Sequence, residues 1–134
     1  MGKSKKTILI KVDADIVTAR QEGRVLASQL GFSGSDQVLI ATAISEAARN
    51  ILQYARSGEI VIDYVKNGEK EGILIIARDQ GPGIKDIRRV MEDGYSSSGG
   101  LGLGLPGIKR LMSEMDIQST PGQGTTITIK KWKL

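Results

Sequence analysis

Two runs of apolar, strand-forming residues separated by Asn67-Gly68 constrain the fold of this chain most strongly. The runs cover residues 59–65 and 73–78 and are rich in isoleucine and valine. An Asn-Gly pair between such runs is typical of a tight β-turn, because both residues tolerate a positive φ. The centre of the chain is therefore expected to form an antiparallel hairpin. Strands and helices around it do not follow the regular alternation of a doubly wound parallel sheet.

The spacing of apolar residues predicts further elements on both sides of the hairpin. Strands are expected over residues 7–12, 117–120 and 125–132. Helices are expected over 15–30 with Asp15 as N-cap, over the segment up to about 56 with Ser35 or Asp36 as N-cap, over 84–91, and from Pro106 to about 115. Residues 92–104 are rich in Gly and Ser, and we expect a flexible loop there. The prediction is one domain over 1–134, an α/β two-layer sandwich with one antiparallel or mixed sheet and its helices on one face.

The composition excludes several kinds of chemistry. The chain has neither cysteine nor histidine, so it can form no Ser-His-Asp triad, no Cys-His pair and no histidine or thiolate zinc site. It also cannot carry a phosphorylated histidine of its own. No apolar run is long enough to cross a bilayer, and the basic start leads into an alternating segment rather than a signal-peptide core. We expect a cytoplasmic protein with no membrane insertion.

The net charge is +4, and lysines are concentrated near both ends of the chain. They could meet an acidic partner or nucleic acid, but solvated termini that keep the protein soluble are the favoured interpretation. Few aromatic residues accompany them, which disfavours a surface that stacks single-stranded bases. No nucleic-acid partner is therefore expected.

The second predicted helix carries Glu46, Arg49 and Asn50 near the edge of its apolar stripe. Residues four apart share a helix face, so Glu46 and Asn50 could point into the same cleft. Asn50 could be a Mg²⁺ ligand, because an ion held mainly by nucleotide phosphates needs only one or two protein oxygens. Glu46 could take a proton from a hydroxyl or from water. Arg49 could pair with Glu46 or face a phosphate, and an ordinary amphipathic helix with a polar rim would look the same.

A second group of candidates follows the buried strand of the hairpin. Asp79 could accept a hydrogen bond from an adenine amino group, with Gly81 and Gly83 letting the base approach the backbone and Ile84 packing on it. Thr125, after the turn Gly122-Gln123-Gly124, could reach the same edge of the base. The alternatives are an Asp-initiated turn and a plain hairpin turn.

A glycine-rich run precedes the helix that contains Pro106. Backbone amides and a helix N-terminus could bind phosphates there, and the run could form a lid over ATP. The run is not a Walker A loop, because no Gly-Lys-Ser/Thr follows it, and it is not a Rossmann fingerprint, because no strand runs directly into the glycines. A mobile loop with no ligand is the alternative. Lys109 and Arg110 could hold phosphate charge or be solvated. The candidate phosphate-binding residues are Gly99, Gly100, Leu101, Gly102, Leu103 and Gly104.

These segments, in this order, resemble the GHKL ATP-binding superfamily. Glu46–Asn50 is similar to its N-box, Asp79–Gly83 to its first glycine box, residues 98–104 to its lid glycines, and Gly122–Thr125 to its last box. The resemblance covers most of the chain. It is closer still to the small bacterial serine-protein kinases of the anti-sigma-factor type, and in particular to stressosome switch kinases, because residues between the motifs match as well.

The resemblance implies a GHKL (Bergerat) fold with ATP and Mg²⁺ as cofactors. Glu46 would be the general base, Asn50 the magnesium ligand and Asp79 the adenine acceptor, with the lid glycines around the triphosphate. The substrates would be Ser or Thr hydroxyls of STAS-domain stressosome proteins. The kinase would then leave them and activate a metal-dependent serine phosphatase. The lid is short for the superfamily, and the chain carries no phosphoacceptor-histidine domain.

Two other functions remain open at this stage. The chain could be an anti-sigma-factor-type module that sequesters or activates a partner, with the nucleotide only setting its shape. It could also be an ATPase of the gyrase or MutL kind, although such enzymes need further domains to couple hydrolysis to motion. Phosphate transfer to a STAS-domain protein distinguishes a kinase from both.

Overall fold

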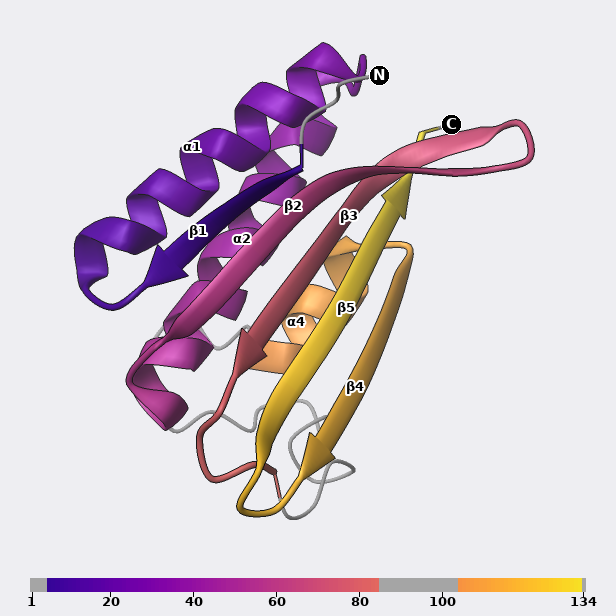
Figure 1. The fold of residues 1–134 in the computed structure, drawn as a ribbon. Coiled ribbons are helices and arrows are strands. Elements are labelled where there is room, and N and C mark those ends of the chain that lie inside the picture. The colour runs from indigo at the N-terminus through magenta and orange to yellow at the C-terminus, as the bar shows by residue number, and fades with distance from the viewer. Residues whose placement is uncertain (1–4, 85–103, 134) are drawn as a thin grey trace.

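The computed structural model describes residues 5–84 and 104–133, and these form a five-stranded sheet covered by helices (Figure 1). The sheet has the order β1-β2-β3-β5-β4, and every neighbouring pair is antiparallel. The strands are β1 (Lys6–Ile10), β2 (Gly58–Asn67), β3 (Lys70–Asp79), β4 (Glu114–Thr120) and β5 (Gly124–Trp132). The described helices are α1 (Asp13–Gln29), α2 (Gly34–Ala55) and α4 (Gly104–Leu111).

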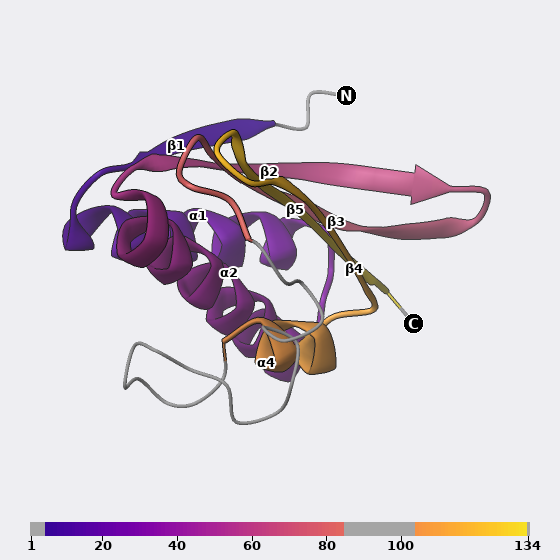
Figure 2. The same cartoon turned by 90° about the horizontal axis from the view of Figure 1, so that it is seen from below.

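The three described helices lie on the same face of the sheet (Figure 2). Alternate strand residues point towards them, and many of these are isoleucines with no exposed surface: Ile10, Ile60, Ile62, Ile73, Ile75 and Ile129. The helices contribute small and branched side chains to the same core, including Ala19, Ile40, Ile44, Ala47 and Ile108. The predicted α/β two-layer sandwich with helices on one face is confirmed, and the sheet is antiparallel in all its pairs.

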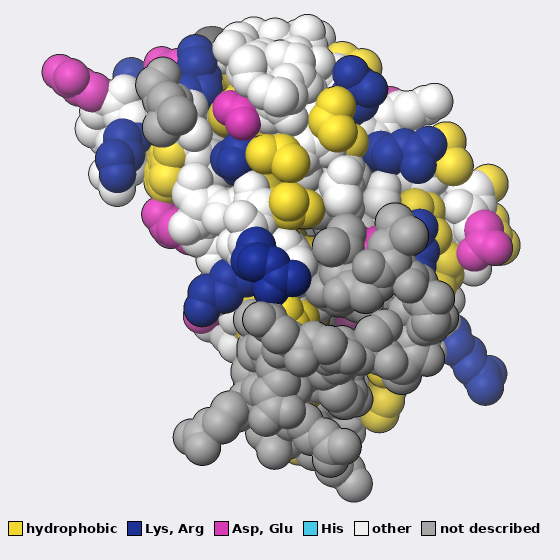
Figure 3. All heavy atoms as spheres, turned by 180° about the vertical axis from the view of Figure 1, so that it is seen from behind, with side chains coloured by type: hydrophobic (Ala, Val, Ile, Leu, Met, Phe, Trp, Pro, Cys, Tyr) yellow, Lys and Arg dark blue, Asp and Glu magenta, His cyan; other side chains and the backbone are white. Residues whose placement is uncertain are grey.

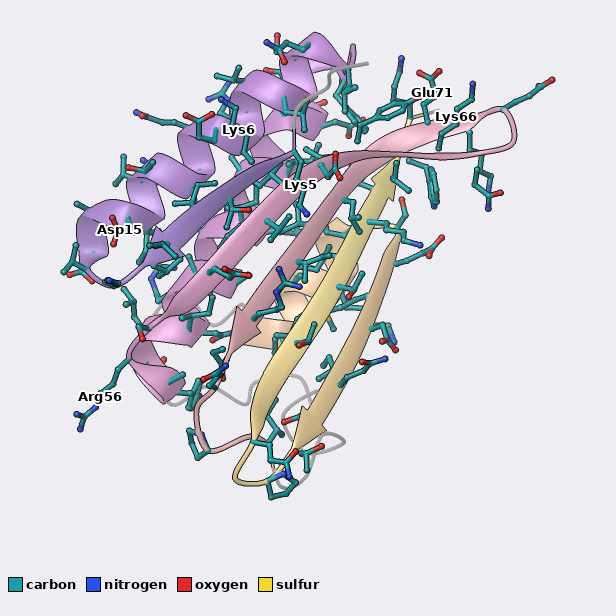
Figure 4. All side chains as sticks on the ribbon, viewed as in Figure 1. Lys5, Lys6, Asp15, Arg56, Lys66 and Glu71 are labelled. Carbon is teal, nitrogen blue, oxygen red and sulfur yellow. The ribbon has the colours of Figure 1, made fainter. Side chains whose placement is uncertain are left out.

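The predicted hairpin forms between β2 and β3. Its register runs from Gly58 opposite Asp79 to Asn67 opposite Lys70, and Gly68 in the turn has a φ of 65°. Both strands are longer than predicted and extend beyond the rest of the sheet (Figure 1). Lys66 and Glu71, which are cross-strand neighbours, lie near the outer end of this hairpin (Figure 4). The register matters for function because it fixes Asp79 at the opposite end.

Helix α1 begins two residues before the prediction, and Asp15 is not its N-cap. Val12 occupies that position, and Asp15 is the third helical residue. The Asp15 carboxylate accepts hydrogen bonds from the backbone amides of Lys11 and Val12, at 2.8 and 3.0 Å. These two bonds hold the pKa of Asp15 below its ordinary value, and the charge of Lys11 acts in the same direction. The carboxylate therefore still accepts hydrogen bonds from backbone amides at the start of the helix, but it does so from the first helical turn and not from the N-cap.

Helix α2 also begins before the predicted Ser35 or Asp36. Ser33 is its N-cap, and its hydroxyl accepts a hydrogen bond of 3.1 Å from the Asp36 amide. The helix ends at Ala55, followed by Arg56 with a φ of 72°. The Arg56 side chain points away from the body of the protein (Figure 4). Helices α1 and α2 approach closely at Gly23, where a methyl group would lie 2.1 Å from Cδ1 of Ile44.

The C-terminal third differs from the prediction at one boundary. The helix that contains Pro106 ends at Leu111, and the following strand begins at Glu114 rather than near Ile117. Ser113 ends the helix by donating its backbone amide to the carbonyl of Lys130, which draws the chain into the sheet edge. Pro106 lies in the first helical turn, as predicted. The predicted helix over 84–91 and loop over 92–104 fall almost wholly outside the described residues.

Several of the lysines near the chain ends have partners within the protein. Lys6 pairs with Glu22 at 3.4 Å, and the Lys131 ammonium donates to the carbonyl of Leu111 at 2.9 Å. On the helical face, basic and acidic side chains are interspersed with apolar ones (Figure 3). None of the helices described here is long and apolar enough to cross a membrane.

Candidate active site

Helix α2 carries the first group of predicted site residues. Every residue from Ala43 to Ala48 is buried, including Ser45, whose hydroxyl donates to the carbonyl of Ala41 at 3.0 Å. Glu46 belongs to this buried stretch and is only 7% exposed. Asn50 follows one turn later and is half-buried. The carboxylate and the carboxamide thus lie along one side of the helix, as the spacing predicted.

Glu46 forms an ion pair with Arg49. Arg49 Nη1 lies 2.5 Å from Glu46 Oε2, while the arginine side chain is 43% exposed. A carboxylate removed from water is costly unless a cation or hydrogen-bond donors compensate it. The structure therefore shows the first of the two roles that the sequence left open for Arg49, the pairing with Glu46.

Asp79 lies at the end of β3, between Gly58 of β2 and Thr125 of β5. Its Oδ1 accepts a hydrogen bond of 2.9 Å from the Gly81 amide, so the side chain initiates the turn that leaves the strand. Its other oxygen, Oδ2, is the one that this turn leaves for a ligand. One carboxylate can therefore initiate the predicted turn through Oδ1 and still accept a hydrogen bond from an adenine amino group through Oδ2.

The turn after Asp79 packs directly against the end of α2. A methyl group on Gly81 would lie 2.6 Å from Cβ of Ala55, so only glycine allows this approach. On the other side, a methyl group on Gly58 would lie 2.9 Å from Ile51 and 3.1 Å from Cβ of Asp79. The segment after β3 descends from the sheet towards the helices (Figure 2). These contacts bring the Asn50 end of α2 and the Asp79 end of β3 together.

A hydrogen-bond network centred on Ser119 ties Thr125 to the same region. The Ser119 hydroxyl accepts from the Ile84 amide at 2.7 Å and lies 2.9 Å from the Thr125 hydroxyl. It also lies 3.1 Å from the Gly124 carbonyl, to which it can donate. Gly83 has a φ of 80° and packs against the carbonyl of Thr120. The structure therefore brings together Asp79, Gly81, Gly83, Ile84 and Thr125.

Sequence reasoning missed two residues of this region. Ser119 connects Ile84 to Thr125, and Ala55 provides the surface on which Gly81 packs. Neither belongs to a motif with its own chemistry. The alternation of the β4 sequence was the only available signal for Ser119, since it places this serine on the same face as Met115 and Ile117.

The phosphate-binding candidates are described only in part. Gly104 is the first residue of α4, which packs against α2, and Lys109 is exposed in the last turn of α4. Gly99, Gly100, Leu101, Gly102 and Leu103 lie outside the described residues.

The donor set fits Mg²⁺ bound mainly through a nucleotide. Among the residues that the structure describes, no three acidic, histidine or cysteine side chains come together as a metal site. The half-buried Asn50 carboxamide offers one hard oxygen, which suits an ion that keeps waters and phosphate oxygens as its other ligands.

Comparisons with known proteins agree with this architecture. Residues 35–134 match the family model described as histidine kinase-, DNA gyrase B-, and HSP90-like ATPase. The chain is 58% identical over 125 residues to the serine/threonine-protein kinase RsbT of Bacillus subtilis (strain 168), and the match covers 93% of this chain and 94% of RsbT. It is 31% identical over 120 residues to the anti-sigma F factor of Thermoanaerobacter sp. (strain X514), covering 85% of this chain and 82% of that protein.

A solved structure shows the same fold. The RsbU and RsbW domains of Rv1364c from Mycobacterium tuberculosis match with a TM-score of 0.63 and 19% sequence identity, over 96% of this chain and 32% of that longer chain. The chain therefore belongs to the histidine kinase-, DNA gyrase B- and HSP90-like ATPase family, as its motifs predicted. Within this family it is an RsbT-like serine/threonine kinase related to the anti-sigma F factors.

Proposed function

We propose that this kinase transfers the γ-phosphoryl group of ATP to serine or threonine hydroxyls of STAS-domain stressosome proteins in the cytoplasm. The observation that carries the proposal is the packing of Gly81 on Ala55, which joins the Glu46 and Asn50 helix to the Asp79 turn. This packing supports a nucleotide site between α2, which carries Glu46 and Asn50, and the turn after Asp79, which lies more than twenty residues further along the chain. The similarity to RsbT supports the choice of a protein hydroxyl as acceptor.

At the adenine end, Oδ2 of Asp79 accepts a hydrogen bond from the amino group of the base, while Oδ1 accepts the hydrogen bond from the Gly81 amide. Thr125 lies beside Asp79 in the sheet and contacts the same edge of the base. Gly81 and Gly83 let the base approach the backbone, and Ile84 packs against it. Ser119 fixes Ile84 and Thr125 relative to each other.

At the phosphate end, Asn50 would hold Mg²⁺, which neutralises phosphate charge when bound. The glycine-rich segment 99–104, most of which lies outside the described residues, would bind the triphosphate together with the ammonium of Lys109. Glu46 orients the acceptor hydroxyl and takes its proton. Such a site works mainly by positioning and electrostatics, because phosphoryl transfer needs little covalent chemistry from the protein.

Two variants separate binding from transfer. Glu46→Ala should reduce phosphate transfer by about 100-fold or more, as expected for a lost general base, and leave ADP affinity within about threefold. Asp79→Asn should weaken ADP by about 10–100-fold, because it removes a charged acceptor. Asp116→Asn, the same change at an exposed position of β4, is the matched control. Calorimetry with ADP and mass spectrometry of STAS-domain proteins after incubation with Mg-ATP provide the measurements. Equal loss of ADP affinity in Glu46→Ala and Asp79→Asn would contradict this division of roles.

A second function follows from the similarity to anti-sigma F factors. The chain would then sequester or activate a partner in a nucleotide-dependent complex. Both functions can operate in sequence, since a kinase released from its phosphorylated substrates would be free to bind and activate a metal-dependent serine phosphatase. Incubation with radiolabelled ATP and a STAS-domain protein distinguishes them: label on the partner supports the kinase, and a stable unlabelled complex supports the binding module.

A further inference from the structure

The ion pair between Glu46 and Arg49 has a consequence for how the proposed base works. Glu46 lies within the buried part of α2, and its side chain is 9% exposed, whereas that of Arg49 is 43% exposed. The arginine is thus partly in water, and its charge compensates the Glu46 carboxylate, which is almost completely shielded from water. Because the two residues are three apart on one helix, their pairing does not depend on the placement of any other element.

The pair makes the two carboxylate oxygens of Glu46 unequal. Oε2 accepts the Arg49 hydrogen bond at 2.5 Å. A guanidinium is protonated at all relevant pH values and offers donors only, so it cannot take a proton from a substrate. Oε1 is the oxygen that this pair leaves to accept one.

We propose that Arg49 is a positioning residue that holds Glu46 so that Oε1 takes the proton of the acceptor hydroxyl. This inference rests on the proposed kinase function. In the step, the hydroxyl O–H bond breaks and its proton moves to Oε1. The hydroxyl oxygen forms a bond to the γ-phosphorus, and the bond from that phosphorus to the β,γ-bridging oxygen breaks. ADP leaves with the electron pair of that bond. Arg49 exchanges no proton at any point.

The competing role for Arg49 is direct contact with a nucleotide phosphate. That contact would require the guanidinium to leave Glu46, and a side chain that is only 9% exposed would lose its counter-ion. An uncompensated buried charge is costly. The two roles predict different kinetics, because a phosphate contact acts on nucleotide affinity, whereas a positioning residue acts on the transfer step.

The test uses the full chain with Arg49→Gln, Arg49→Lys and the control Arg24→Gln, which removes the same charge from an exposed position of α1. Transfer from Mg-ATP to the STAS-domain protein that the wild type phosphorylates gives kcat and KM, calorimetry gives ADP affinity, and thermal unfolding confirms that each variant folds. For Arg49→Gln we expect kcat to fall by about 10–100-fold, part of what a general base contributes, with KM and ADP affinity within about threefold. Arg49→Lys should recover most of the lost rate, because an ammonium still compensates the carboxylate. Arg24→Gln should behave as wild type.

Three results would overturn the inference. An unchanged kcat in Arg49→Gln would remove the positioning role while leaving the kinase function intact. A parallel loss of ADP affinity in Arg49→Gln would assign Arg49 to a phosphate instead. A wild-type protein that transfers no phosphate would refute the proposed function itself, and the inference with it.

Discussion

Arg56 ends helix α2 in a backbone conformation that favours glycine. Its φ is 72°, and it is the sole non-glycine residue with a positive φ among residues 5–84 and 104–133. A side chain in this region costs about 1–2 kcal/mol, whereas glycine costs less than about 1 kcal/mol through the entropy of the unfolded chain. Arg56→Gly should therefore raise the free energy of unfolding by about 0.5–1 kcal/mol. Urea denaturation measures this gain. Arg56→Ala keeps a Cβ, so an equal gain in that variant would mean that charge, and not φ, is responsible.

Asp15, at the start of α1, should make the free energy of unfolding depend on pH. Hydrogen bonds from the amides of Lys11 and Val12 lower its pKa, so the folded state favours the carboxylate. The stabilisation is fully present above the ordinary pKa of an aspartate, about 3.9, and is lost as the pH falls through the lowered value. We expect the unfolding free energy of the wild type to fall more steeply below about pH 4 than that of Asp15→Asn. Urea denaturation from pH 2.5 to 6 tests this, and parallel curves would contradict it.

At the residue scale, the sequence predicted in which elements the candidate site residues lie, while their roles stay predictions. Glu46 and Asn50 follow from helical spacing, and Asp79 follows from its place after a buried strand. Ser119 could not be predicted as a site residue, because its contacts with Ile84 and Thr125 arise from the pairing of β4 with β5 and from the path of the chain after Gly83. Ala55 matters only through the close approach of Gly81.

The packing of α1 on α2 depends on Gly23. Alanine is the better helix former by about 1 kcal/mol. A methyl group here, however, would lie 2.1 Å from Cδ1 of Ile44, whose side chain is fully buried. Overpacking typically costs about 1–3 kcal/mol, so Gly23→Ala should lower the free energy of unfolding by about 1–2 kcal/mol. Gly34→Ala, at the start of α2 where nothing lies within 4 Å, is the control and should not destabilise.

Ile44→Val identifies the cause of this effect, because it removes the atom that the new methyl group would meet. The single change should cost about 0.5–1.5 kcal/mol by itself. In the double variant, the cost should be smaller than the sum of the two single costs by about 1 kcal/mol. Strict additivity in denaturant unfolding would show that the clash with Ile44 is not the source.

Element boundaries show where sequence patterns stop being informative. The apolar periodicity located α1 and α2, but each begins earlier than predicted, because Val12 and Ser33 are the N-caps. Periodicity reports which residues are buried, and the first turn of these helices is largely exposed. The end of α4 at Leu111 is set by the bond from Ser113 to Lys130 of β5, a tertiary contact that no local pattern encodes.

The described residues share one core between a single sheet and a single helical layer. Helix α2 contacts β1, β2, β3 and α4, so no part of the described structure has a separate apolar interior. The prediction of one domain therefore implies that the protein unfolds in one cooperative transition, seen alike by circular dichroism and by the fluorescence of Trp132. Two separated transitions would contradict it.

The nucleotide should stabilise the whole domain, because its proposed site lies between α2, the end of β3 and the start of β5. A ligand that binds only the folded state adds about 2.7 kcal/mol at 100 times its Kd. For a domain of this size that energy corresponds to a rise in Tm on the order of 10 °C. We expect this rise with saturating Mg-ADP and no change in the number of transitions. Mg-GDP is the control, because guanine presents a carbonyl where adenine presents the amino group that would donate a hydrogen bond to Asp79. An equal shift with both nucleotides would mean that the base is not read at Asp79, even if the phosphates bind.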